Sequence, residues 1–130
     1  MTEYRVRGIM RTDGPTLTAE TPIRRAMALL IDARAAVAPV LAEDGQMIGL
    51  LSQKDCFRPA LHASYHREWS GRVADWMSRE IVSVEAEDEV IRVAEMFLTH
   101  PHRVFPVMDG RLVAGLLHRS DVLALLVRIG

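Results

Sequence analysis

The sequence has little cysteine, a single lysine and no long apolar run. Cys56 is the only cysteine, so the chain has no internal disulfide and no zinc site built from several cysteines. No apolar stretch approaches the roughly 20 residues that a membrane-spanning helix needs. The first residues also lack the apolar core of a secretory signal peptide. We therefore expect a cytoplasmic protein with no membrane segment.

A strong charge of either sign is missing too. The 16 basic residues nearly balance the 17 acidic ones, so no electric field favours a nucleic acid or an anionic membrane. Hydrophobic residues make up 49% of the chain and charged residues 25%, which is typical of a folded globular protein. A length of 130 residues suits one compact domain or two small domains that support each other.

The sequence does contain a duplication. Residues 18–33 align with residues 85–100, and both stretches have the apolar spacing of an amphipathic helix. The apolar positions are Ile23, Ala26, Met27, Leu30 and Ile31 in the first copy and Val90, Val93, Ala94, Phe97 and Leu98 in the second. We expect Thr21 to cap the first helix and Pro22 to lie in its first turn. Acidic residues 87–89 should stabilise the first turn of the second helix.

The alignment continues after each helix. Residues 37–40 (VAPV) match residues 104–107 (VFPV), and an Asp-Gly pair typical of a tight turn follows each of them. Residues 47–55 (MIGLLSQKD) then match residues 113–121 (VAGLLHRSD), after a turn that differs in length by one residue. Each copy therefore predicts the order strand, helix, strand, strand, helix.

The element boundaries follow from the same alignment. We predict first strands at residues 15–18 and 81–84, and final helices from 53 to about 65 and from 119 to about 129. Pro59 should kink or shorten the earlier of these final helices. Short helical segments at residues 6–10 and 73–77 lead into the two copies.

A single copy of about 60 residues buries only roughly 60% of its unfolded surface and is marginally stable alone. We therefore predict that two copies pack about a pseudo-twofold axis. The expected fold is α/β, of the α+β type, with repeats at residues 5–66 and 72–130 joined by a polar link.

The element order, the Pro-Val strand, the Asp-Gly turn and the ending Gly-Leu-Leu-x-x-x-Asp together resemble a cystathionine-β-synthase (CBS) domain. Two such domains in tandem resemble a CBS pair, or Bateman module. The resemblance implies a non-catalytic sensor that binds AMP, ADP, ATP or S-adenosylmethionine in clefts between the repeats and requires no cofactor. It also implies a homodimer formed through the CBS helices, and a regulated protein that the sequence does not identify.

The stretch GLLSQKD supports two interpretations of Asp55. Ser52 and Asp55 are spaced as a capping box, in which each side chain accepts a hydrogen bond from the other residue's backbone. The start of a helix also attracts phosphate, and a carboxylate there is able to accept hydrogen bonds from two ribose hydroxyls. The resemblance favours ribose binding by Asp55, with Ser52 and Lys54 near the phosphates.

The second copy, GLLHRSD, departs from this pattern. His118 replaces the serine and is a poor cap, yet the acid persists as Asp121. The resemblance gives Asp121 the ribose and places His118, Arg119 and Ser120 beside the phosphates. Arg119 as a solvated surface side chain is the alternative.

The pair His102-Arg103 precedes the second Pro-Val strand and looks like the His-Arg pair that adenylate-sensing CBS proteins place against phosphates. The first copy has Ala35-Ala36 there, so we expect phosphate-binding groups to be richer in one cleft. A simple helix ending at this proline-containing stretch is the alternative.

The adenine base needs apolar surfaces and backbone groups. The resemblance draws these from the first strand and the Pro-Val strand of each repeat. The candidates are Leu17, Thr18, Val37, Ala38, Pro39, Ile81, Val82, Val104, Phe105 and Pro106.

Two other functions compete with the sensor. A ligand-free structural dimerisation module fits the missing serine at 118 and the missing His-Arg pair in the first copy. An enzyme ranks last, because no arrangement of side chains suggests a nucleophile. His62 and His66 have a spacing that occurs in metal sites, but no third ligand accompanies them, so we predict no metal site.

Overall fold

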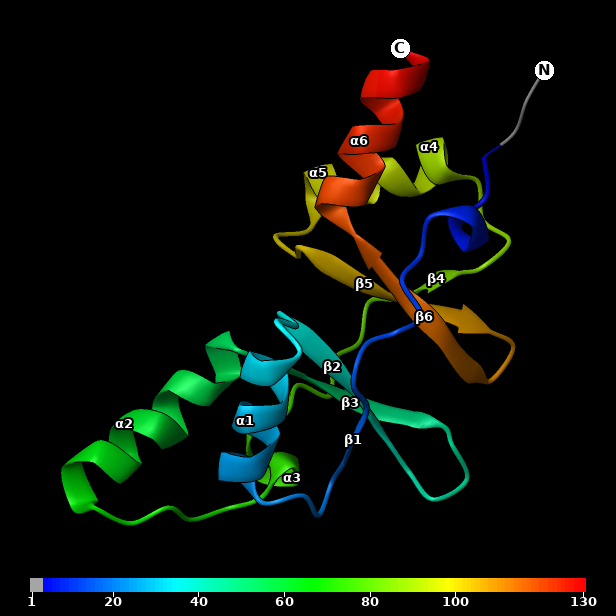
Figure 1. Cartoon of the computed structure of the whole chain (residues 1–130). Coiled ribbons are helices and arrows are strands. Elements are labelled where there is room, and N and C mark those ends of the chain that lie inside the picture. The colour runs from blue at the N-terminus through cyan, green and yellow to red at the C-terminus, as the bar shows by residue number, and fades with distance from the viewer. Residues whose placement is uncertain (1–3) are drawn as a thin grey trace. The chain divides into compact units, whose positions relative to one another are not determined.

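Two three-stranded sheets organise the chain in the computed structural model, which describes residues 4–130 (Figure 1). The first unit comprises Gly14–Ile81, and the second unit joins residues 4–13 to Val82–Gly130. Each sheet consists of a parallel strand pair extended by an antiparallel hairpin. The α/β class and the predicted order of strand, helix, strand, strand, helix are confirmed in both units.

The first unit places one sheet against the apolar side of its first helix. Its elements are β1 (Leu17–Thr18), α1 (Ile23–Asp32), β2 (Val37–Leu41), β3 (Met47–Ser52), the 3-10 helix η2 (Lys54–Cys56), α2 (Phe57–His66) and α3 (Val73–Trp76). Helix α1 buries Ile23, Ala26 and Leu30, which are three of the predicted apolar positions. Pro59 falls in the first turn of α2, where a missing N–H is tolerated, so the α-helix starts at Phe57 rather than at residue 53.

The second unit repeats this arrangement. Its elements are η1 (Val6–Gly8), β4 (Val84–Glu85), α4 (Val90–Ala94), α5 (Met96–Thr99), β5 (Val104–Asp109), β6 (Leu112–His118) and α6 (Arg119–Ile129). Its core gathers side chains from all three strands and from helices α4 and α6 around the fully buried Phe105. The predicted helix at residues 119–129 is confirmed.

Three local predictions are wrong. Pro22 rather than Thr21 is the N-cap of α1, because the Thr21 hydroxyl instead accepts a hydrogen bond from the N–H of Thr18 at 3.3 Å. Acidic residues 87–89 precede α4 rather than filling its first turn. The amphipathic stretch that begins there is divided at Glu95 into α4 and α5.

The first strand of the second copy also begins later than predicted. Strand β4 starts at Val84, so Ile81 and Val82 lie before it. The physical reason is that the preceding segment is already bound to the first unit. Ser78 exchanges two backbone hydrogen bonds with Leu50, at 2.8 and 2.9 Å.

The lead-in segments, residues 6–11 before the first copy and residues 73–78 before the second, each pack in the unit that contains the sheet of the other copy. The segment before the first copy packs in the second unit, where Val6 joins the core and Arg11 exchanges two backbone hydrogen bonds with Leu116. The segment before the second copy packs in the first unit, where Val73 and Met77 join the core. Each unit therefore combines the lead-in of one repeat with the sheet and helices of the other, whereas the repeats predicted at 5–66 and 72–130 follow the duplication along the sequence.

This exchange explains the glycine in each Gly-Leu-Leu stretch. A Cβ atom on Gly115 would lie 2.6 Å from the carbonyl oxygen of Arg11. A Cβ atom on Gly49 would lie 2.7 Å from the sulfur of Met77 and 2.9 Å from the carbonyl oxygen of Ser78. Only glycine lets the lead-in approach the edge strand this closely.

Candidate functional site

Asp55 is held at the start of η2 by a capping box. The N–H of Ser52 donates to Asp55 Oδ2 at 2.9 Å, and the N–H of Asp55 donates to Ser52 Oγ at 3.0 Å. This is the reciprocal pattern that the spacing of the two residues predicts. Among the described residues, the second carboxylate oxygen, Oδ1, accepts no hydrogen bond. Asp55 is therefore fixed in position while one of its oxygens stays available.

The residues beside Asp55 supply little positive charge. Gln53 donates from its side chain to the carbonyl of Ala35 at 2.9 Å, and its backbone N–H donates to the carbonyl of Ala36. The side chain of Lys54 is exposed and is the nearest cation along the chain. The pair of alanines leaves this end of the sheet without the His-Arg pair of the second copy.

Asp121 has a different partner. Arg11 donates from Nε to Asp121 Oδ2 at 2.7 Å and from Nη2 to Asp121 Oδ1 at 3.0 Å. This two-pronged hydrogen-bonded ion pair lowers the pKa of Asp121 below its usual value. Sequence reasoning missed Arg11, because the residue lies in a lead-in that packs against the other copy. The signal that could have found it is its place directly after Met10, where the second copy has Ser78 after Met77.

His118 does not replace the serine cap. It is the N-cap residue of α6, but its side chain makes no capping hydrogen bond. Burial lowers the pKa of His118, and the nearby charge of Arg11 lowers it further. The ring is therefore neutral at pH 7, and it contributes a dipole rather than a charge at this end of the sheet.

The other basic candidates gather at the same end of the second sheet. The N–H of Arg119 donates to the carbonyl of Arg103 at 2.8 Å, so the two arginines start from adjacent backbone positions and extend exposed side chains. Ser120 follows in the first turn of α6 and is also exposed. His102 is half-buried, and its ring lies 5.6 Å from the ring of Phe105. The structure thus brings together the four candidates His102, Arg103, His118 and Arg119 around the Val104–His118 strand pair.

The ten candidates for the base pocket fall into groups. Leu17 and Ala38 belong to the core of the first unit, and Phe105 belongs to the core of the second. Strand alternation puts four others on the opposite faces of the two sheets: Val37, Pro39, Val104 and Pro106. The remaining three, which lie at or before the short first strands, are the exposed Thr18 and the half-buried Ile81 and Val82.

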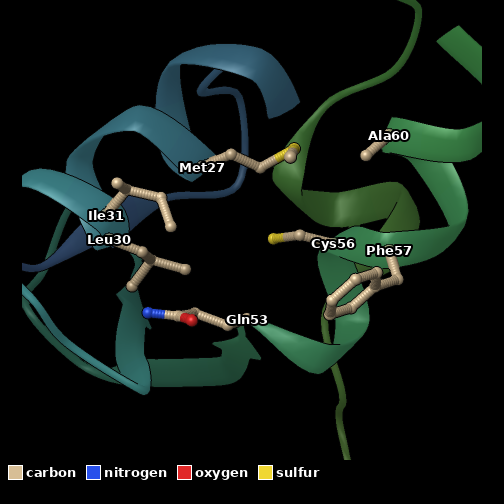
Figure 2. Close-up of a pocket in the computed structure, with 7 residues that line it drawn as sticks. All are labelled: Met27, Leu30, Ile31, Gln53, Cys56, Phe57 and Ala60. Carbon is tan, nitrogen blue, oxygen red and sulfur yellow. The ribbon is translucent and has the colours of Figure 1, made fainter. Parts of the chain in front are cut away.

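A pocket in the first unit is apolar, and Asp55 is not among the residues that line it. Figure 2 shows its lining from α1 on one side and from η2 and α2 on the other. The lining residues are Met27, Leu30, Ile31, Gln53, Cys56, Phe57 and Ala60. Its volume of about 130 Å³ is below the range of about 300–1,000 Å³ that is typical of small-molecule sites. With Gln53 as its one polar side chain and no charged group, it does not match a nucleotide.

Cys56 has the properties of a core residue. Burial and the neighbouring Asp55 charge raise the pKa of its thiol to about 11, so the reactive thiolate is scarce at neutral pH. The rings of His62 and His66 lie with their centroids 4.5 Å apart and their planes tilted by 42°, on an exposed face of α2. Within residues 4–130, no group of three histidine, cysteine or acidic side chains is arranged to hold a metal ion.

Within residues 4–130, no helix combines the length with the apolar character that a membrane span requires.

Two segments of the chain match the sequence model of the CBS domain, at residues 6–61 and 73–128. The uncharacterized protein YlbB of Bacillus subtilis is 24% identical over 119 residues, which cover 91% of this chain and 79% of YlbB.

Solved structures share the fold at low sequence identity. The CBS-pair protein CBSX2 from Arabidopsis thaliana is 21% identical and superimposes with a TM-score of 0.83, covering 98% of this chain and 97% of CBSX2. CBSX2 in complex with AMP gives a TM-score of 0.82 at 22% identity, covering 97% and 98%. The CBS pair of protein MJ0100, in complex with 5′-methylthioadenosine and S-adenosylmethionine, gives 0.82 at 20% identity, covering 99% and 100%.

Proposed function

Because this chain belongs to the CBS-domain family and carries two CBS domains in tandem, we propose that it is a non-catalytic sensor of an adenosine-containing ligand. Relatives of the same fold have been solved with AMP, or with 5′-methylthioadenosine and S-adenosylmethionine, which all contain adenosine. AMP, ADP or ATP is the expected ligand and S-adenosylmethionine the alternative. The observation that carries the proposal is the placement of Asp55, held at a helix start with one carboxylate oxygen available.

Ribose recognition is assigned to Asp55 and Asp121. A carboxylate accepts hydrogen bonds from the 2′ and 3′ hydroxyls at once, and a fixed carboxylate does so with little loss of conformational freedom. The capping box fixes Asp55 through one carboxylate oxygen, whereas Arg11 fixes Asp121 and already engages both of its oxygens. Both aspartates remain half-buried, which leaves them within reach of a ligand.

Phosphate contacts are assigned mainly to the second unit. Arg103 and Arg119 extend from adjacent backbone positions, and the hydroxyl of Ser120 lies in the first turn of α6. Arginine and the N–H groups of a helix start both favour phosphate oxygens. His102 and His118 complete this group, whereas the first unit offers Ser52 and Lys54. We therefore expect a nucleotide to prefer the groups of the second unit for its phosphates.

The adenine base is assigned to the sheet faces that turn away from the cores. Val37 and Pro39 lie on this face in the first unit, and Val104 and Pro106 lie on it in the second; Val37 is half-buried and the other three are buried. Ala38 and Phe105 are fully buried in their cores, so they support these strands from behind.

A binding experiment tests the proposal. Isothermal titration with AMP, ADP, ATP and S-adenosylmethionine should give saturable binding of at least one of them, and a ligand at 100 times its dissociation constant should stabilise the fold by about 2.7 kcal/mol. Asp55→Ala and Asp121→Ala should each weaken that binding. Asp32→Ala, at the exposed end of α1, is the matched control and should bind like the parent. Binding that is equal in all three variants would refute the site assignment.

We also propose that the chain forms a homodimer through its CBS helices. Large apolar side chains stay exposed on these helices, and exposed apolar surface is typical of an interface. The exposed residues are Ile31, Phe57, Leu61 and Tyr65 on α1 and α2, and Leu98, Leu123 and Val127 on α5 and α6. Sedimentation equilibrium should give twice the mass of 14.6 kDa for the parent and a lower mass for Leu123→Glu.

A ligand-free structural dimerisation module is the second candidate function. The observation that favours it is the engagement of both Asp121 oxygens by Arg11, which leaves this carboxylate fully paired within its own unit. A dimer that binds none of the four compounds would support this function and would refute the sensor.

The adenosine-ligand sensor proposed above would act in the cytoplasm on a regulated protein.

A further inference from the structure

We infer that Arg11 makes the two ribose-binding aspartates unequal, so that Asp55 accepts a nucleoside more readily than Asp121 does. The inference rests on the proposed function, since it concerns the same two carboxylates. It adds a specificity-determining residue that comes from outside the duplicated Gly-Leu-Leu-x-x-x-Asp motif.

The geometry at Asp121 is that of an occupied carboxylate. Arg11 donates to both carboxylate oxygens, at 2.7 and 3.0 Å, with two nitrogens of one planar guanidinium group. A ribose would present its two hydroxyls to the same pair of oxygens. A bidentate arginine and a bidentate diol therefore compete for one edge of the carboxylate.

The first unit has no such competitor. The backbone of Ser78 pairs with Leu50 as the backbone of Arg11 pairs with Leu116, so the two residues occupy equivalent places. The Ser78 hydroxyl donates to the carbonyl of Glu80 at 3.4 Å rather than to Asp55. Asp55 instead uses one oxygen in the capping box and keeps the other available among the described residues.

The size of the effect follows from the exposure of the pair. The side chain of Arg11 is 50% exposed and that of Asp121 is 29% exposed. Exposed ion pairs are worth up to about 1 kcal/mol, which corresponds to roughly a two- to fivefold loss of affinity for a ligand that must displace them. Arg11 thus weakens binding at Asp121 without abolishing it.

Adenosine is the probe that isolates this competition. It carries the ribose diol but no phosphate. Because adenosine is uncharged, removing the positive charge of residue 11 changes no direct charge–charge attraction to the ligand. In an Asp55→Ala background, which leaves the Asp121 site, titration calorimetry should show roughly two- to fivefold tighter adenosine binding when Arg11→Ser is added. With 2′-deoxyadenosine the gain should shrink, because one of the two donors is missing.

Salt gives an independent readout. Raising the ionic strength from about 0.05 to 0.5 M screens an exposed ion pair. Adenosine binding to the Asp55→Ala protein should tighten over this range, whereas the protein that also carries Arg11→Ser should show no such change. Arg11→Gln, which keeps a long side chain, guards against a packing defect in the serine variant.

Two matched variants complete the experiment. Ser78→Arg in an Asp121→Ala background builds the equivalent arginine beside Asp55 and should weaken adenosine binding there. Arg111→Ser removes one exposed arginine at the turn between β5 and β6 and should change nothing. Unchanged or weaker adenosine binding in both Arg11 variants would overturn the inference, whereas a parent protein that binds none of the adenosine compounds would overturn the proposed function itself.

Discussion

Asp55 in the first unit and Asp121 in the second occupy equivalent places in the duplicated sequence, yet different neighbours hold them. Asp55 exchanges hydrogen bonds with Ser52, three residues away, whereas Asp121 pairs with Arg11, 110 residues away. The second copy has His118 at the place of Ser52, so Asp121 has no capping partner within its own motif and pairs with the distant Arg11 instead. The comparison teaches that the backbone of a repeat is preserved more faithfully than the contacts of its side chains.

The two cores differ in the same way. Phe105 fills the centre of the second core and stacks on Phe97 with ring centroids 4.5 Å apart. Ala38 and Leu30 occupy the equivalent places in the first unit, and Leu30 lines the apolar pocket there. The backbone pairing follows the same pattern in both sheets, while the side chains at equivalent core positions differ in size.

The largest expected effect is on the core of the second unit. Phe105→Ala should lower the free energy of unfolding by about 3–5 kcal/mol, because it removes a fully buried aromatic side chain. Ala38→Gly, at the equivalent place, should cost only about 0.5–1 kcal/mol. Urea denaturation measures both. Equal losses would show that the two cores do not differ in the way described.

The close approach of each lead-in gives the second prediction. Gly115→Ala should cost about 1–3 kcal/mol, because its Cβ would meet the backbone oxygen of Arg11 at 2.6 Å. Gly49→Ala should cost less, because its closest backbone neighbour, the carbonyl oxygen of Ser78, would lie farther away at 2.9 Å, and the nearer sulfur of Met77 belongs to a flexible side chain. Gly8→Ala is the control, because a Cβ atom there would meet no neighbouring atom of the described residues within 4 Å. Denaturation curves in which Gly8→Ala is as destabilised as Gly115→Ala would contradict this account.

The loss of a helix cap should lower the free energy of unfolding by a smaller amount, and only in the first unit. Ser52→Ala should lower the free energy of unfolding by about 1 kcal/mol, because the N–H of Asp55 loses its acceptor. His118→Ala should lose no cap, since the histidine side chain makes no such bond. Thermal unfolding followed by circular dichroism is a suitable measurement, and a larger loss for His118→Ala would reverse the comparison.

The smallest effect is a pH dependence confined to the second unit. Burial lowers the pKa of His118 in the folded chain, so the unfolded chain binds a proton more readily. Stability should therefore fall as the pH drops below about 6.5, the unperturbed pKa of histidine. His118→Ser should reduce this slope between about pH 7 and pH 5.

Asp121 titrates separately: its lowered pKa gives stability that is present above about pH 4 and is lost only in stronger acid.

Unfolding free energies measured at several pH values check this prediction. A steeper acid loss in His118→Ser than in the parent would show that the folded chain favours the charged ring.

Sequence reasoning predicted the local contacts of the candidate site, because its motifs are local; which residues bind a ligand stays a prediction. The capping box of Ser52 and Asp55 follows from their spacing, and the absence of a cap at His118 follows from its chemistry. The shifted start of β4 and the role of Arg11 were missed, since both depend on lead-in segments that bind the other copy. Periodicity and spacing report neighbours within a few residues and carry no information about such exchanges.

The duplication, the order of strands and helices, the turns and the positions of the two aspartates can be read from the amino-acid pattern, because they depend on periods and propensities within each copy. The lead-in that pairs with each sheet, the partner of Asp121 and the need for glycine at position 115 become visible only in the folded chain. An edge strand has unpaired backbone groups that pair with any extended segment placed beside it, and packing of distant residues places that segment.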